Sequence, residues 1–105
     1  MKTLNCGLLA NSYVYFTDQE LKKIKNIIKS LLNNNNKITF YYFYKDGFIE
    51  TCLEIIEKEK NSSIFIEKIN QEEFFNKIDL LLLYEKPCSQ KLNVIFSNNI
   101  INICD

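Results

Sequence analysis

Short apolar runs alternate with segments of helical periodicity along the chain, and this alternation constrains the fold more than any other feature. The runs that read as strands are residues 3–9, 37–44, 63–69, 78–84 and 100–104. The segments that read as helices are 17–32, 48–60, a short one opening at Asn70, and a shorter one at 91–96. Strands that alternate with helices favour a parallel sheet with right-handed crossovers. The sequence therefore predicts an α/β fold.

Two of the predicted helices start at a recognisable cap. Thr17 and Glu20 have the spacing of a capping box, and Asn70 and Glu73 repeat it. After Thr17, apolar residues recur every three or four positions with lysines between them, as on one face of an amphipathic helix. Four asparagines at 33–36 should end this helix, because asparagine tolerates the left-handed conformation.

The strand patterns differ in polarity, and this indicates their places in the sheet. Residues 37–44 are apolar on both faces, as expected of a strand covered on both sides. Residues 63–69 are more polar at their end and should lie near an edge. The continuous apolar run 78–84 is the candidate for the sheet centre, with Asp79 as a strand-start residue that bonds solvent or backbone.

These patterns combine into one prediction. Residues 1–105 form a single three-layer, Rossmann-like domain with a five-stranded, mostly parallel sheet in the order of about 3-2-1-4-5.

The composition excludes several classes of function. Net charge is zero, and all 13 basic residues are lysine, so nothing favours binding to DNA, RNA or an anionic membrane. Histidine is absent, which excludes Ser-His and Cys-His catalysis and most zinc sites. We therefore assign no catalytic residue, no metal ligand and no cofactor.

The four cysteines, Cys6, Cys52, Cys88 and Cys104, are far apart and form no CxxC pair. They read as free thiols without disulfides, with Cys88, which follows Pro87, as the one candidate for reactivity. The N-terminal apolar run is too short for a signal peptide, and no run approaches the ~20 residues that span a bilayer. We expect a cytoplasmic protein.

Three segments, in this order and spacing, resemble the SLOG superfamily of Rossmann-like nucleotide-binding domains. Ile38–Tyr41 leads into the turn Asp46–Phe48 and a helix that ends at Lys58–Lys60. Glu73–Tyr84 is similar to the family's acidic helix followed by an Asp-Leu-Leu strand, and Ile100–Ile103 to its closing Ile-Ile-Asn-Leu. The resemblance spans nearly the whole chain and implies a stand-alone domain that binds a nucleotide or a nucleotide-derived signal.

The chain departs from the family where the ligand would bind. The family has glycine-rich turns there, which let backbone approach phosphate. In their place stand Phe43–Gly47 after the second strand and Glu85–Gln90 after the fourth, with Gly47 the one glycine. Ala10–Ser12 replaces a Gly-His-Arg, Ile49 stands where an acidic residue is expected, and the phosphoribohydrolase members' Pro-Gly-Gly motif is absent. These departures disfavour catalysis of that kind.

In open α/β sheets, ligands bind beyond the carboxyl ends of the strands, where the strand order reverses. The residues predicted to line that crevice are Asn11, Ser12, Tyr13, Tyr44, Lys45, Asp46, Gly47, Glu85, Lys86, Ser89 and Gln90. Side-chain amides and hydroxyls can recognise a sugar or base, tyrosine can stack on a base, and lysines can meet phosphate. The backbone amides that open the helix at Phe48 add a partial positive charge. Ordinary solvated loops would carry the same residue types.

Three hypotheses follow from the sequence. The first is non-catalytic binding of a nucleotide-type small molecule, which would sequester a signal or regulate a partner. The second is a nucleotide N-glycosidase or phosphoribohydrolase with unusual residues, and the third is an interaction domain that has lost its ligand pocket. Zero net charge and an aromatic content of 13% also predict a homo-oligomer, as is common by resemblance among such domains.

Overall fold

The fold is taken from a computed structural model, which describes residues 2–10, 17–59, 61–84 and 99–102. The elements in chain order are β1 (Thr3–Ala10), α1 (Asp18–Asn34), β2 (Lys37–Tyr42), α2 (Gly47–Glu59), β3 (Ile64–Lys68), α3 (Gln71–Lys77), β4 (Leu80–Tyr84) and β5 (Asn99–Asn102). The predicted helix at 91–96 lies outside the described residues.

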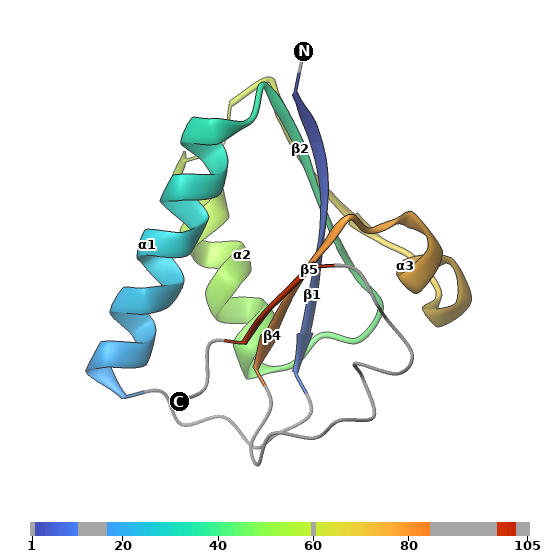
Figure 1. Ribbon diagram of the computed structural model, residues 1–105. Helices are drawn as coiled ribbons and strands as arrows, with labels where there is room; N and C mark the ends of the chain where they lie inside the picture. The colour runs from blue at the N-terminus through green and yellow to red at the C-terminus, as the bar shows by residue number, and fades with distance from the viewer. Residues whose placement is uncertain (1, 11–16, 60, 85–98, 103–105) are drawn as a thin grey trace.

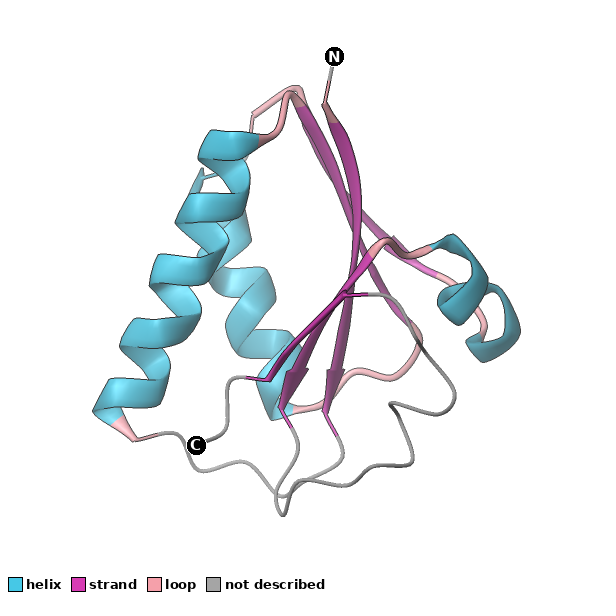
Figure 2. Cartoon of the chain, viewed as in Figure 1, coloured by secondary structure: helices cyan, strands magenta, loops and turns pink. Residues whose placement is uncertain are grey.

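The five strands form one parallel sheet in the order β3-β2-β1-β4-β5. Helices α1 and α2 pack on one face of the sheet and α3 lies on the other (Figure 1). The coloring by secondary structure shows the same three layers, with the sheet in the middle (Figure 2). This confirms the predicted α/β class, the Rossmann-like layering and the strand order.

One prediction about the sheet is wrong: its central strand is β1 and not β4. The run at 78–84 is continuously apolar because every residue of β4 is buried. A strand is buried on both faces when it has a strand on each side and is covered on both faces of the sheet. β4 meets this condition because it lies between β1 and β5, so its burial does not require the central position. The more polar β3 lies at the edge, as predicted.

Three strands, β2, β3 and β4, are shorter than predicted, and the bounds of β2 and β4 have identifiable reasons. β2 ends at Tyr42 because Phe43 leaves the strand and packs against Phe74, with ring centroids 4.9 Å apart. β4 begins at Leu80, since Asp79, just before it, forms two hydrogen bonds with the backbone of Asn5, one through its own amide and one through its side chain. The Asp79 amide donates to the Asn5 carbonyl at 2.7 Å, and the Asn5 amide donates to Oδ2 of Asp79 at 3.1 Å. Asp79 is thus a strand-start residue with a backbone partner, as predicted.

The ends of α1 show one prediction confirmed and one corrected. The Thr17 hydroxyl accepts from the Glu20 amide at 3.1 Å, and a Glu20 carboxylate oxygen accepts from the Thr17 amide at 3.0 Å, which completes the capping box. At the other end, Asn35 is extended, with φ −133°, and not left-handed. Its side-chain amide instead donates to the free carbonyl of Leu31 at 2.8 Å.

No helix in the described part of the chain is long and apolar enough to cross a membrane.

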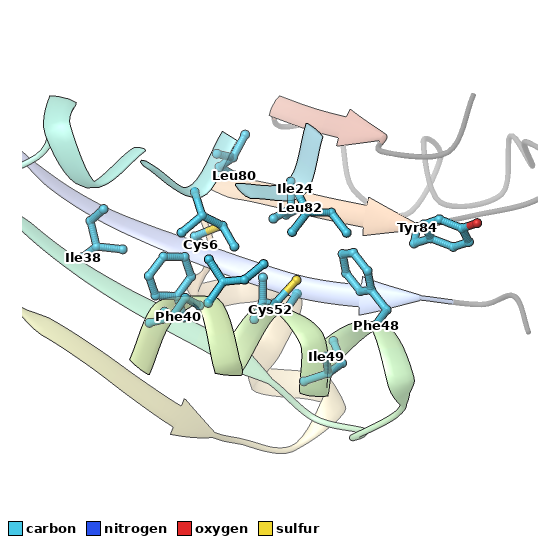
Figure 3. Close-up of a cluster of buried hydrophobic side chains, with 14 of the residues drawn as sticks. Cys6, Ile24, Ile38, Phe40, Phe48, Ile49, Cys52, Leu80, Leu82 and Tyr84 are labelled. Carbon is cyan, nitrogen blue, oxygen red and sulfur yellow. The ribbon is translucent and has the colours of Figure 1, made fainter. Parts of the chain in front are cut away.

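The sheet separates two hydrophobic cores. The larger lies under α1 and α2, and Figure 3 shows Phe40, Phe48 and Cys52 within it. The four residues of α2 predicted to face the sheet, Phe48, Cys52, Ile55 and Ile56, are all buried. The smaller core joins the ring of Phe74 on α3 to residues on the opposite face of β2 and β4. α3 is therefore attached through a small set of contacts.

The thiols of Cys6 and Cys52 are both free and buried in the larger core (Figure 3). Burial raises the pKa of Cys6 from 9.0 to about 12, and it raises the pKa of Cys52 as well. Neither thiol forms a disulfide, as predicted for these two positions. Cys88 and Cys104 lie outside the described residues.

Because these thiols stay protonated in the folded state, we expect the chain to lose stability at alkaline pH. Between pH 9 and 10.5 the unfolded state releases the protons that the folded state keeps. Each thiol should then lower the free energy of unfolding by about 1.4 kcal/mol per pH unit. Urea denaturation across this range measures the slope, and Cys6→Ala should make it shallower. A Cys6→Ala slope equal to that of the parent would contradict the prediction. In the native state at pH 7, neither thiol should react with a thiol reagent.

Candidate functional site

The carboxyl ends of the strands define the edge of the sheet where a ligand is expected. From β1 the chain crosses on one face to β2 and then β3, and it returns on the other face to β4 beside β1. The order therefore reverses between β1 and β4, whose last residues, Ala10 and Tyr84, are register partners. In open parallel sheets this is the position of the ligand crevice.

Four of the predicted site residues belong to the described part of the chain: Tyr44, Lys45, Asp46 and Gly47. They follow β2, one strand away from the reversal point. The others, Asn11, Ser12, Tyr13, Glu85, Lys86, Ser89 and Gln90, lie outside the described residues.

The segment after β2 presents three kinds of chemistry. The ring of Tyr44 is 66% exposed, which is unusual for an aromatic side chain and suits stacking. The Lys45 ammonium is exposed, and the Asp46 carboxylate is half-buried. Gly47 is exposed and is the first residue of α2, so the predicted turn glycine lies inside the helix.

Asp46 acts as the cap of α2, which changes the electrostatics predicted for this edge. Its Oδ1 accepts from the Ile49 amide at 3.0 Å. The partial positive charge of the amides that open this helix should by itself favour an anion such as phosphate. One of them is already satisfied by a carboxylate, and a second anion ~4 Å from it would be repelled by up to ~4 kcal/mol at an effective dielectric constant of 20. This end of α2 therefore suits a hydrogen-bond donor better than a phosphate.

Lys45 also stands among carboxylates. It lines an open depression of about 550 Å³ together with Glu50, Glu54 and Glu57 of α2. These charges lower the positive potential around its ammonium group, so Lys45 alone makes a weak anion site.

A buried polar pair beside the reversal point was missed as a site feature. Glu20 is 5% exposed, and its two carboxylate oxygens accept from the Tyr84 hydroxyl at 3.3 and 3.2 Å. The ring of Tyr84 packs against Phe48, with centroids 5.8 Å apart. The end of β4 is thereby fixed to the first turns of both α1 and α2.

Sequence reasoning explained Glu20 by a local partner, Thr17, and had no reason to look for a second. The signal available was indirect: Tyr84 is the one residue with a polar group in its strand, and it stands at the end of a wholly apolar run. A buried tyrosine hydroxyl requires a partner, and a carboxylate at the start of a neighbouring helix can provide one.

Within the described residues, no three Cys, Asp or Glu side chains gather into a group that could hold a metal ion. No family model, curated protein or solved structure matches the chain.

Proposed function

We propose that the chain binds a nucleotide or nucleotide-derived signal molecule at the carboxyl edge of its sheet and does not turn it over. The observation that carries this proposal is the parallel sheet whose order reverses between β1 and β4. Such a reversal leaves a crevice between crossovers that run on opposite faces, and small molecules bind there in folds of this kind.

The described residues at this edge support a particular orientation of the ligand. Tyr44 offers an exposed ring face for a base. Asp46 offers a carboxylate oxygen that can accept from a ribose hydroxyl or an exocyclic amine. Lys45 is the cation closest in sequence to these groups, and it would meet a phosphate at the periphery of the site.

Calorimetry against a panel of cyclic and linear nucleotides tests the proposal. A hydrogen bond to a charged group contributes about 1.5–3 kcal/mol, and the carboxylates around Lys45 place its contribution at the low end, so Lys45→Ala should weaken binding by roughly tenfold. Affinity should also fall as salt is raised, because an exposed cation is screened.

Lys2→Ala is the matched control, since Lys2 is exposed and adjoins the start of β1 at the opposite edge of the sheet. It should bind as tightly as the parent. Native mass spectrometry of protein purified from cells gives a separate measurement, in which a retained small molecule is expected. Equal affinity of the Lys45→Ala and Lys2→Ala variants for a nucleotide that binds the parent would place the ligand elsewhere. If no nucleotide binds and none is retained, the proposed function is wrong.

A further inference from the structure

The two helices on one face of the sheet carry opposite charges. After its first turn, α1 contains four lysines and no acidic residue. α2 contains four glutamates and a single lysine, Lys58. Both helices lie on the same side of the sheet (Figure 2), so a positive and a negative surface stand next to each other. Lys29 of α1 and Glu59 of α2 line one small cavity, which marks where the two surfaces meet.

The charges form stripes along the helices. Lys22, Lys25 and Lys29 are spaced by three and four residues, and Glu50 and Glu54 by four, so each set shares one side of its helix. All five side chains are exposed. No ion pair within the described residues engages any of them. Like charges at these spacings repel each other along an isolated helix, and an opposite charge from outside would relieve the repulsion.

The negative stripe also has the shape to receive lysine side chains. The open depression of about 550 Å³ on α2 has Leu53 as its apolar part and three glutamates, Glu50, Glu54 and Glu57, against two lysines, Lys45 and Lys58, so its lining carries a net negative charge. A lysine can lay its hydrocarbon stem on such an apolar floor while its ammonium group reaches the carboxylates. A helix with lysines every three or four residues, such as α1, fits this surface.

We propose that this face binds a second copy of the chain, with α1 of each copy packed on α2 of the other. A two-fold axis that lies in the interface and runs parallel to the helices produces this arrangement. It places α1 of the first copy over α2 of the second, and α2 of the first over α1 of the second. The contact is self-complementary, so the dimer has two such pairings, each between the lysine stripe of one copy and the glutamate stripe of the other. With zero net charge, the two copies have no overall repulsion to overcome.

The size of this surface sets the expected strength. At 1.5 Å per residue, the 17 residues of α1 and the 13 of α2 are about 25 and 20 Å long. Two helices about 10 Å apart then give a patch roughly 20 Å on each side. That is about 400 Å² per copy and about 800 Å² in total, below the ~1,200 Å² of a stable specific interface and in the range of weak, transient ones, so the dimer should dissociate readily and weaken as salt screens the charges.

Sedimentation at 50 and 500 mM salt, over micromolar to millimolar protein, tests the proposal. The parent should be dimeric at low salt, with at least a tenfold weaker association at high salt. Reversing either stripe, by Glu50→Lys with Glu54→Lys or by Lys25→Glu with Lys29→Glu, should weaken self-association at least tenfold. Circular dichroism verifies that each variant is folded.

The decisive result comes from mixing the two reversed variants. One carries two positive helices and the other two negative ones, so together they should form a heterodimer at low salt. The control is Glu67→Lys with Glu72→Lys, the same charge change on β3 and α3, which should leave the parent's association unchanged. A parent that is monomeric throughout, a reversed variant that still self-associates, or a mixture that stays monomeric would each overturn the proposal.

Discussion

Replacing Gly7 with alanine should lower the free energy of unfolding by about 2–3 kcal/mol, at the upper end of the usual effect of overpacking a core. A Cβ atom at this position would lie 2.6 Å from Cζ of Phe74 and 2.7 Å from Cδ1 of Ile78. Phe74 is fully buried, so its ring has little space into which it can move. The backbone of β1 is held by β2 on one side and β4 on the other. Urea denaturation of the variant measures the loss.

Gly47→Ala provides the matched control, with the same added methyl group at a different place. Gly47 is exposed in the first turn of α2, where alanine is a better helix former. This variant should be as stable as the parent or more stable by up to ~1 kcal/mol. If Gly7→Ala unfolds at the same urea concentration as Gly47→Ala, the close approach of α3 to β1 does not limit stability.

Local signals explain why so much of the fold could be predicted from the sequence. The Thr17–Glu20 box fixes where α1 begins through bonds that span three residues. The spacing of apolar residues that distinguishes a strand from a helix can likewise be read within a single short segment. The strand order then follows if every crossover is right-handed and the connecting helices move once from one face of the sheet to the other. None of these steps needs knowledge of distant contacts.

Contacts between distant residues are what the sequence could not provide. In the sequence, Gly7 looks like an ordinary glycine in a strand. A side chain is excluded there because Phe74, which is far away along the chain, packs against it. Glu20 has a complete local explanation as a cap, yet it also bonds Tyr84, 64 residues away. The centre of the sheet was misassigned for a different reason: the predicted strand order already has the first strand in the middle, and the apolarity of β4 reflects burial on both faces and not a central position.

The segment after β2 shows a related limit, because a sequence pattern does not reveal which polar groups are already paired. Asp46 directly precedes α2. Its carboxylate is engaged by the Ile49 amide, so it shields the partial positive charge at this end of α2. An aspartate before a helix caps that helix whenever geometry allows, and a ligand must then compete with a bond that is already formed.

Truncation of Phe74 should have the largest single effect, about 3–5 kcal/mol of the free energy of unfolding. Its ring is fully buried and makes edge-on contacts with Phe43 and Phe75, at 4.9 and 5.1 Å between centroids. α3 has seven residues, too few to be stable without packing. Phe74→Ala should therefore loosen α3 as a unit. Phe65→Ala is the control, because that ring is 42% exposed, and it should change stability by less than ~1 kcal/mol.

Combining the two substitutions tests whether Gly7 and Phe74 act on each other directly. In Phe74→Ala the ring that the new Cβ would strike is gone, and Ile78 is the remaining close neighbour. The double variant should therefore be more stable than the sum of the single effects predicts, by about 1–2 kcal/mol, within the range for residues in contact. Denaturation of the parent, both single variants and the double variant closes the cycle. Effects that add to within ~0.5 kcal/mol would mean that Gly7 is needed for some reason other than the approach of Phe74, because only residues without a shared contact are additive.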